Sequence, residues 1–383
     1  MNQTAIDSKP RKVLVMLNGD LVGGVEVWAL TYGVRSRGAP DYTPILLSLK
    51  DGGFRLRAEN RSLELRCMPT RHPFDLALVD RVAELIREEE IDLVHTHTVR
   101  ANFVGRLAAR KAGVPVVSHI HSRTLDESAN RFKNRVNWYY DRLTEKLTDR
   151  FVFVAPSLQR DYPPYPAAVI PNGVEPMMDG VPRRDLRPEL GIPQGAPVFG
   201  CIAVLRARKG VADLIHAAEL VIHRVPDAHC LIVGSEAEPG YVDRLKELAA
   251  DLGVTHRVHF TGYRDDVPDV LHTLDLLCLP SIYGEGLPLI VLESLFATRP
   301  VVATRVEGTT LAVRDGETGC LVEPRNTSGL AECIANLLGD DDLRREMGER
   351  GRADALERFT PERMIRDLHE VYDQVLAEYR GKV

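Results

Sequence analysis

Two glutamates, Glu285 and Glu293, stand eight residues apart in a stretch that predicts a loop followed by a helix. Residues 281–300 read SIYGEGLPLIVLESLFATRP. Apolar residues at helical spacing predict a helix over about 287–297, and Pro288 suits its first position because a missing N–H costs nothing there. The bare N–H groups at such a helix start favour an anion, and a diphosphate is the natural one. Glu293 lies roughly 7 Å further along the axis, so the carboxylates can hold groups on opposite sides of a diphosphate, as in a nucleotide-sugar.

The same stretch resembles the signature of a known enzyme family. The run EGLPLIVLE, with PVVATRVEG and DGETGCLVEP after it, is similar to the donor-binding region of retaining glycosyltransferases of family GT4, which have the GT-B fold. Taken alone, two glutamates are more often a loop residue and a solvated helix residue. The resemblance implies instead an E-x7-E pair in which one carboxylate binds the donor sugar and the other the ribose. It implies donor contacts for the residues that start the helix, namely Gly286, Leu287, Pro288 and Leu289.

Composition excludes several other classes of protein. A chain of 383 residues predicts two to three domains, and a hydrophobic content of 44% is ample for their cores. The net charge of −6 provides no basic field for nucleic acid. No run approaches the ~18 apolar residues that span a bilayer, and residues 1–12 lack a secretory signal, so we expect a cytoplasmic protein. No cysteine or histidine cluster has metal-ligand spacing, and four cysteines in apolar stretches are expected to be reduced core thiols: Cys201, Cys230, Cys278 and Cys320.

The chain opens as a strand, a glycine-rich turn and a helix, which is the start of a doubly wound sheet. Residues 13–30 read VLVMLNGDLVGGVEVWAL. The glycines do not form G-x-G-x-x-G, so a dinucleotide site is poorly supported. Gly23 and Gly24 let a ligand approach the backbone closely, although a plain tight turn would use them equally well. GGVEVWAL resembles the GG-x-E turn of the family, which implies that both glycines face the donor diphosphate.

Four histidines lie at the ends of the next two predicted strands, in IDLVHTHT and PVVSHIHS. Open α/β sheets place their ligands at such ends. His95, His97 and His119 are more often hydrogen-bonded structural groups in this position. His121 matches the histidine that approaches the donor sugar in the family, and we expect it to be catalytic.

Residues 130–150 predict a basic amphipathic helix. Its apolar residues recur at helical spacing: Phe132, Val136, Tyr139, Tyr140 and Leu143. One hypothesis is peripheral contact with the anionic inner face of a membrane through residues 130–147. The other is a helix that packs on its own domain and has a solvated face. Acidic residues at 141, 145 and 149 weaken the membrane hypothesis.

The second half of the chain begins again with a strand, a basic loop and a helix, in FGCIAVLRARKGVADLIHAAELV. The basic side chains of that loop can make charge-assisted hydrogen bonds to phosphate oxygens. Lys209 matches the family's lysine directly. Val204 stands where the family has an arginine, so Arg206 or Arg208 is expected to take that role, and Arg206 is our choice for donor binding.

Two further segments resemble donor contacts less closely. Tyr263 and Arg264 match residues that lie beside the nucleobase in the family, although each could equally belong to a surface turn. Glu307 and Leu311 depart from the family's G-G-x-x-E. Aspartate runs such as 340–342 read as helix caps, and we expect no metal and no cofactor.

These observations predict a GT-B fold of two doubly wound Rossmann-like domains that face each other across a cleft. The acceptor-side domain is expected over 12–168 together with a C-terminal helix, 360–380, that crosses back to it. The donor-binding domain is expected over 169–359.

The predicted reaction moves a sugar from a UDP- or GDP-sugar to an acceptor hydroxyl with retention at the anomeric carbon. His121, Lys209 and Glu285 are the predicted catalytic residues. Bacterial cell-surface polysaccharide, glycolipid or small-glycoside synthesis is the expected setting, and lipid-linked acceptors are among the substrates considered. Two alternatives use the same donor pocket: a sugar-nucleotide epimerase, which needs no acceptor, and a non-catalytic nucleotide-sugar-binding protein, which the departures at Val204 and Leu311 motivate.

Overall fold

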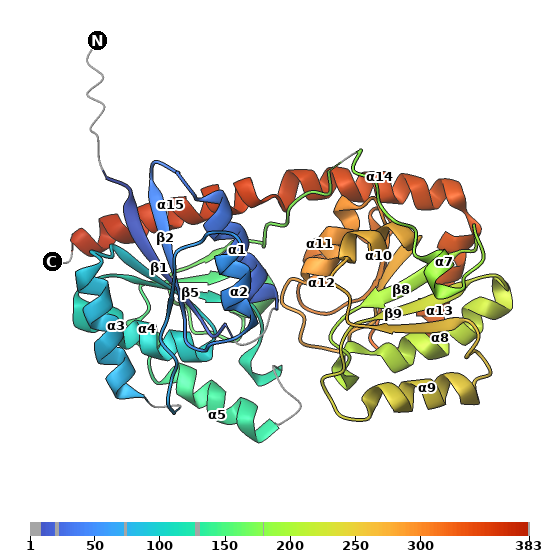
Figure 1. Ribbon diagram of the computed structural model, residues 1–383, viewed down its shortest axis with the longest axis horizontal. Coiled ribbons are helices and arrows are strands. Elements are labelled where there is room, and N and C mark those ends of the chain that lie inside the picture. Colours follow the sequence, from blue (N-terminus) through green and yellow to red (C-terminus); the bar gives the residue numbers. More distant parts are fainter. Residues whose placement is uncertain (1–8, 20–22, 73–74, 127–130, 179, 382–383) are drawn as a thin grey trace, which may run out of the picture. The chain divides into compact units, whose positions relative to one another are not determined.

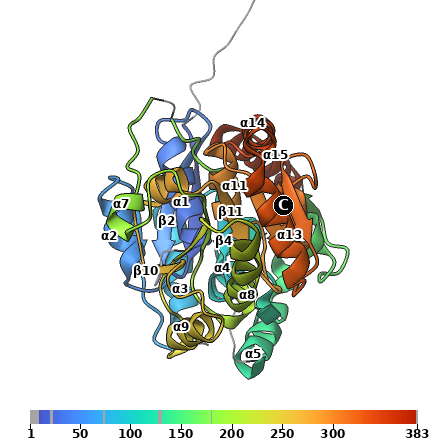
Figure 2. The same cartoon turned by 90° about the vertical axis from the view of Figure 1, so that its right-hand side faces the viewer.

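A computed structural model of the chain describes residues 9–19, 23–72, 75–126, 131–178 and 180–381. The chain divides into two units. Unit 1 ends at Gly173 and resumes at Pro361, and unit 2 comprises Val174–Thr360. Each unit contains one parallel sheet with helices on both faces (Figures 1 and 2), which confirms the predicted doubly wound architecture.

The sheet of unit 1 has seven strands in the order β3-β2-β1-β4-β5-β6-β7. Its central strands are short apolar runs whose side chains are buried on both faces, as parallel sheets require. The strands are β1 (Arg11–Leu17), β2 (Tyr42–Ser48), β3 (Leu65–Cys67), β4 (Leu93–His97), β5 (Val116–Ile120), β6 (Arg150–Phe153) and β7 (Ala167–Val169).

Two layers of helices cover the sheet of unit 1. The helices α1 (Gly24–Arg35), α2 (Gly53–Glu59) and α15 (Pro361–Arg380) pack on one face, and α3 (Leu76–Glu88) and α4 (Val99–Ala112) pack on the other (Figure 1). The predicted C-terminal helix therefore returns to the first unit, where Leu368 and Tyr372 are fully buried. The remaining helices are α5 (Arg131–Arg142), α6 (Pro156–Gln159), and the short 3-10 helices η1 (Thr124–Asp126) and η2 (Glu145–Leu147).

The sheet of unit 2 has six strands in the order β10-β9-β8-β11-β12-β13. They are β8 (Val198–Ile202), β9 (His229–Val233), β10 (Val258–Gly262), β11 (Leu276–Leu279), β12 (Val301–Thr304) and β13 (Gly319–Val322). One face is covered by α8 (Val211–Arg224), α9 (Tyr241–Asp251) and α13 (Thr327–Gly339), and α8 and α13 lie side by side (Figure 2). The others are η3 (Ala207–Lys209), α7 (Arg187–Leu190), α10 (Val267–Thr273), α11 (Leu289–Phe296), α12 (Thr309–Ala312) and α14 (Asp341–Arg358).

The expectation that Cys320 is a reduced core thiol was wrong. Cys320 of β13 forms a disulfide with Cys333 of α13. Helix α13 packs beside its own sheet, and this brings the two Cα atoms to 6.3 Å, within the range that a disulfide bridges. Cys201, Cys230 and Cys278 are buried free thiols, as expected.

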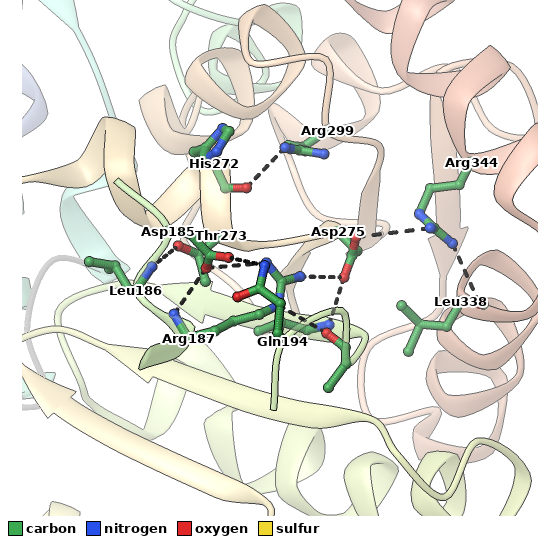
Figure 3. A network of polar contacts seen from close by, with 12 residues as sticks. Asp185, Leu186, Arg187, Gln194, His272, Thr273, Asp275, Arg299, Leu338 and Arg344 are labelled. Carbon is green, nitrogen blue, oxygen red and sulfur yellow. Dashed lines mark hydrogen bonds and ion pairs between the residues drawn. The ribbon is translucent and has the colours of Figure 1, made fainter. Parts of the chain in front are cut away.

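A polar network around Asp275 joins the amino ends of β8 and β11 in unit 2 (Figure 3). One carboxylate oxygen of Asp275 accepts the backbone N–H of Val198 at 2.7 Å and a guanidinium N–H of Arg187 at 3.2 Å. The other oxygen lies 3.9 Å from a guanidinium nitrogen of Arg344 in α14. The network holds the amino ends of these strands together. Ligands of such open sheets bind at the opposite ends, which are the carboxyl ends of the strands.

Candidate functional site

Glu285 is buried just before α11, in the loop that follows β11. Its carboxylate accepts a hydrogen bond from the hydroxyl of Ser281 and forms an ion pair with Lys209. The side chains of Lys209 and Glu285 are only 15% and 6% exposed, so water screens this pair little. The sequence placed these two residues 76 positions apart, and the sheet brings them into contact because β8 and β11 are neighbours.

Close backbone packing holds the loop of Lys209 against the loop of Glu285. Gly210 has φ +66°, and a Cβ there would lie 1.9 Å from the carbonyl oxygen of Pro280, so only glycine fits. Arg208 donates to the carbonyl oxygens of Tyr283 and Gly284, at 3.2 and 2.8 Å. Arg208 therefore ties one loop to the other, and its guanidinium is occupied by backbone.

Arg206 has a different environment from Arg208. Burial lowers the pKa of its guanidinium, the nearby Arg208 lowers it further, and the carboxylates of Glu238 and Glu285 oppose that shift. Of the two arginines that could replace the family's arginine at Val204, Arg206 is the one in electrostatic contact with Glu285. The phosphate contact of Arg206 stays a prediction.

Glu293 contrasts with Glu285. It lies in α11, which begins at Leu289 with Pro288 as its N-cap, two residues after the predicted start at about 287. Among the described residues no side chain or backbone group forms a hydrogen bond or ion pair with its carboxylate. Desolvation raises the pKa of Glu293 to about 7. A half-buried carboxylate without a partner is unfavourable for stability, so a ligand group that donates hydrogen bonds is the expected partner.

Glu307 holds the backbone of the loop that contains Glu285. One of its carboxylate oxygens accepts the backbone N–H groups of Gly284 and Glu285, both at 3.1 Å. Next to it, Gly308 lies so close to the loop that a Cβ would meet the carbonyl oxygen of Gly286. The residue that departs from the family pattern therefore positions the backbone of Glu285. Sequence reasoning noted this departure but missed its role, and it missed Ser281.

Tyr263 and Arg264 follow β10 in unit 2. The side chain of Tyr263 is 64% exposed. Arg264 is committed to protein contacts, because its guanidinium binds both carboxylate oxygens of Asp266, at 2.8 and 2.6 Å, and one of Glu189 at 2.6 Å. Hydrogen bonds from Arg264 lower the pKa of Asp266 to about 2. Arg264 thus holds this turn in place, and Tyr263 has the exposed ring that a base could contact.

In unit 1, the glycine pair lies at the start of α1. Gly23 is the N-cap and Gly24 the first helical residue, and both are exposed. The carboxylate of Glu26, which is buried, accepts the N–H of Gly23 at 3.1 Å. The Glu of the GG-x-E turn therefore caps the helix, and both the N–H and the carbonyl oxygen of Gly23 are bonded within the helix start.

The four histidines gather at the carboxyl ends of β4 and β5. His95, His97 and His119 are buried, and His121 is half-buried. His97 Nδ1 lies 2.8 Å from His121 Nε2, and His95 Nδ1 lies 2.6 Å from the Tyr372 hydroxyl. Desolvation lowers the pKa of His121 to about 3, so its ring is neutral at physiological pH. A neutral ring can donate one hydrogen bond to a sugar hydroxyl or accept one from it.

The sequence profile of the glycosyl transferases group 1 matches residues 182–354, and that of glycosyltransferase family 4 matches residues 22–177. The D-inositol 3-phosphate glycosyltransferase of Nocardia farcinica is 31% identical over 324 residues, which cover 78% of this chain and 71% of the relative. The chain belongs to glycosyltransferase family 4. The N-acetyl-α-D-glucosaminyl L-malate synthase of Bacillus anthracis is 28% identical to this family 4 enzyme over 326 residues, which cover 81% of the chain and 82% of that protein.

Solved structures show the same fold. Anabaena HepE, crystallised with UDP and glucose, superposes with a TM-score of 0.81 at 23% identity and covers 95% of this chain, with 100% of HepE matched. The fold of this family 4 glycosyltransferase is therefore GT-B. Its candidate site residues form two groups: Lys209, Glu285 and Glu293 at the carboxyl ends of the strands in unit 2, and the glycine pair with His121 at the corresponding ends in unit 1.

The apolar face of helix α5 is more exposed than expected for a helix that packs on its own domain, which was one of the two sequence-based hypotheses. Residue 130 lies outside the described part of the chain. Three apolar side chains of α5 and one that directly follows the helix form an exposed stripe: Phe132 (78%), Val136 (44%), Tyr139 (60%) and, after the helix, Leu143 (70%). Tyr140 alone of the predicted apolar set is buried, where it stacks on Phe103. Within the described residues, no helix has the length and apolar character needed to cross a bilayer.

Proposed function

We propose that this enzyme transfers a sugar from a nucleoside-diphosphate donor to an acceptor hydroxyl, with retention at the anomeric carbon. The observation that carries the proposal is the contrast at the start of α11. Glu285 is paired with a lysine, and Glu293 is desolvated and without a partner among the described residues. A nucleotide-sugar donor offers a partner at both places. Its diphosphate can pair with Lys209, and its ribose hydroxyls can donate hydrogen bonds to Glu293.

Each residue then has a distinct role in the transfer. Lys209, Arg206 and the free N–H groups that begin α11 at Leu289 stabilise the negative charge on the leaving diphosphate. Glu285, once released by Lys209, accepts hydrogen bonds from the sugar hydroxyls. In unit 1, His121 and the glycine pair Gly23 and Gly24 remain the donor contacts that the sequence predicts. Positive charge that is already in place needs no reorganisation when the glycosidic bond breaks.

A donor screen followed by product analysis tests this function. Thermal shifts across UDP- and GDP-sugars identify the donor, because a ligand that binds only the native state raises the Tm. Incubation with that donor and candidate acceptors should give a glycoside whose anomeric configuration equals that of the donor, measured by NMR. An inverted product would refute retention. Isomerisation of the donor without any acceptor would support an epimerase instead.

We further propose that α5 brings the enzyme to an anionic membrane surface, where lipid-linked acceptors reside. The exposed apolar stripe carries the exposed cations Lys133 and Arg135 on the same helix. The acidic residues that weakened this hypothesis face inward. Asp141 pairs with the buried Arg106 at 2.8 Å, and Glu145 pairs with Arg142 at 2.6 Å. The surface of α5 therefore combines apolar and basic groups, as interfacial helices do.

Vesicle binding tests the role of α5. The enzyme should cosediment with vesicles that contain phosphatidylglycerol and less with pure phosphatidylcholine vesicles. The double variant Phe132→Ser, Leu143→Ser should lose binding while it keeps its Tm, because both side chains are exposed in the native protein. The matched control is Leu56→Ser, a 65% exposed leucine of α2 in the same unit. Equal binding of the double variant and the wild type would refute this surface.

A further inference from the structure

Two His-x-His pairs stand side by side in the sheet of unit 1. In β4, His95 and His97 alternate with Thr96, so their side chains leave the same face of the strand. Strand β5 runs parallel to β4, and the pairing places His97 directly opposite His119. Neither pair has metal-ligand spacing by itself. The register of the two strands brings three of the imidazoles together, and sequence separation alone does not reveal this grouping.

The three imidazoles are close enough to share one ion. One ring nitrogen from each of His95, His97 and His119 lies within 4.8 Å of the others. The ring centroids are 4.2 Å apart for His95 and His97 and 5.1 Å apart for His97 and His119. Tetrahedral zinc with bonds of about 2.0–2.1 Å needs nitrogens about 3.3 Å apart. Small rotations of the rings within the cluster cover the difference.

Each ring has a nitrogen that the protein leaves without a partner. His95 Nδ1 bonds to the Tyr372 hydroxyl, and His97 Nδ1 bonds to His121 Nε2. Among the described residues, the buried Nε2 atoms of His95 and His97 and both ring nitrogens of His119 have no hydrogen-bond partner. A buried polar atom that makes no hydrogen bond lowers stability. The sheet thus holds three imidazoles together, each with at least one nitrogen that the described residues do not satisfy.

The protein contacts on the other nitrogens suit metal ligands. A histidine that binds a metal through Nε2 usually donates its Nδ1–H to a second group, which fixes the tautomer and the ring orientation. Tyr372 can accept that proton from His95, and His121 can accept it from His97.

We propose that His95, His97 and His119 form a binding site for one divalent cation of the class that prefers imidazole, such as Zn²⁺. Nitrogen ligands favour Zn²⁺, Ni²⁺ and Cu²⁺ over Mg²⁺ and Mn²⁺, which take oxygen ligands. A cavity of about 40 Å³ lined by His119, His121 and Asn102 reaches the cluster and has room for a water molecule as the fourth ligand. The site lies in unit 1, where the proposed ligand His97 is bonded to the predicted catalytic residue His121.

Trp28 provides an internal probe of this site. Its ring centroid lies 4.4 Å from that of His97 and 5.1 Å from that of His119. The chain has two tryptophans, and the other is Trp138 of α5. A paramagnetic ion such as Co²⁺ bound by the histidines should therefore quench Trp28, and Trp28→Phe should remove that quenching without preventing the ion from binding.

The experiment titrates the chelator-treated full-length enzyme with Zn²⁺ and, separately, with Co²⁺. We expect one ion per chain by calorimetry, a Tm that rises with Zn²⁺ and not with Mg²⁺, and Co²⁺ absorption bands with quenched tryptophan fluorescence. His97→Asn and His119→Phe should each weaken binding at least tenfold. If one variant fails to fold, the other and the Trp28→Phe quenching measurement still decide the question.

His259→Asn is the matched control in unit 2. Nε2 of His259 lies 2.8 Å from Nδ1 of His229. Arg257 lies 2.8 Å from Nε2 of His229, and its positive charge opposes a cation there. This variant should bind Zn²⁺ as the wild type does. The proposal is overturned if 100 µM Zn²⁺ neither binds the wild type nor shifts its Tm. It is overturned equally if both unit 1 variants retain full affinity, or if His259→Asn is the variant that loses it.

Discussion

Replacing Glu293 with glutamine should stabilise the enzyme and lower its affinity for the donor. The carboxylate of Glu293 is desolvated and has no hydrogen-bond or ion-pair partner among the described residues, and burial raises its pKa from the ordinary 4.5 to about 7. Glutamine has the same shape and remains neutral at every pH. It therefore removes the cost of ionising a group that the protein does not solvate, a change typical of functional sites that trade stability for activity.

The magnitude follows from the shift in pKa. Each pKa unit corresponds to 1.36 kcal/mol, so a rise from 4.5 to about 7 amounts to about 3 kcal/mol. Because the folded-state pKa is raised, the folded protein binds this proton more tightly than the unfolded chain does. The free energy of unfolding of the wild type therefore falls as pH rises from 4.5 to about 7. The advantage of Glu293→Gln should be close to zero at pH 4.5, reach about 3 kcal/mol near pH 7, and stay constant above it.

Scanning calorimetry at several pH values measures this difference. For a unit of this size, about 3 kcal/mol corresponds to a Tm difference of roughly 6–12 °C. The matched control is Glu285→Gln, the same substitution eight residues earlier. Glu285 is paired with Lys209 and bonded to Ser281, so its neutralisation leaves a buried ammonium without its partner and should lower the Tm. A gain for Glu293→Gln that is equal at pH 4.5 and pH 8, or a loss of stability, would refute the reasoning.

The same pair of variants should separate the two ends of the donor. The contact of Glu293 with ribose is similar in the ground state and the transition state, so Glu293→Gln should raise the donor KM and the Kd for the nucleoside diphosphate. Wild-type affinity should increase between pH 6 and pH 8 as the carboxylate ionises, and the variant should lack this contribution. Glu285→Gln should lower kcat more than it changes nucleotide affinity. If the nucleotide Kd changes only for Glu285→Gln, the proposed orientation of the donor is reversed.

Three further outcomes are expected. Lys209→Ala should reduce turnover on the order of 100-fold with the circular dichroism spectrum unchanged, because it removes one preorganised charge from the leaving diphosphate; unchanged turnover would exclude Lys209 from the site. Excess EDTA should leave transfer intact at 25 °C, because Lys209 and Arg206 supply the positive charge there; recovery by added Mg²⁺ after loss would contradict this. Asp141→Ala should destabilise the enzyme by about 3–5 kcal/mol, since it leaves the fully buried Arg106 unpaired, with no change in donor KM; a wild-type Tm would show that this pair does not matter.

Features that depend on nearby residues in the sequence were predicted well. The expected C-terminal helix, 360–380, starts within one residue of α15, and the expected helix over about 287–297 starts within two residues of α11. Both signals are local, because helical periodicity and proline positions act within a few residues. The glycine pair was likewise placed at the start of α1 from its spacing alone.

Features that depend on the register between strands or on packing were not predicted. The Cys320–Cys333 disulfide requires α13 to lie beside β13, and the histidine grouping requires His97 to pair with His119 across two strands. The exposure of the α5 stripe was also missed, because periodicity identifies an apolar face but not what covers it. Its acidic residues counted against membrane contact in the sequence, and only the structure shows that Asp141 points to Arg106.

The contact between Lys209 and Glu285 has a consequence for how the donor enters. The lysine and the glutamate neutralise each other, and water screens the pair little because both side chains are mostly buried. A diphosphate that reaches Lys209 must compete with Glu285 for it. When the diphosphate binds Lys209, the carboxylate of Glu285 becomes available to the sugar hydroxyls. A nucleoside diphosphate without a sugar would release Glu285 from Lys209 but offer no hydroxyl group to its carboxylate. The intact donor should therefore bind more tightly than the nucleoside diphosphate, because its sugar bonds to Glu285. Glu285→Gln should abolish most of this difference in affinity between donor and nucleotide.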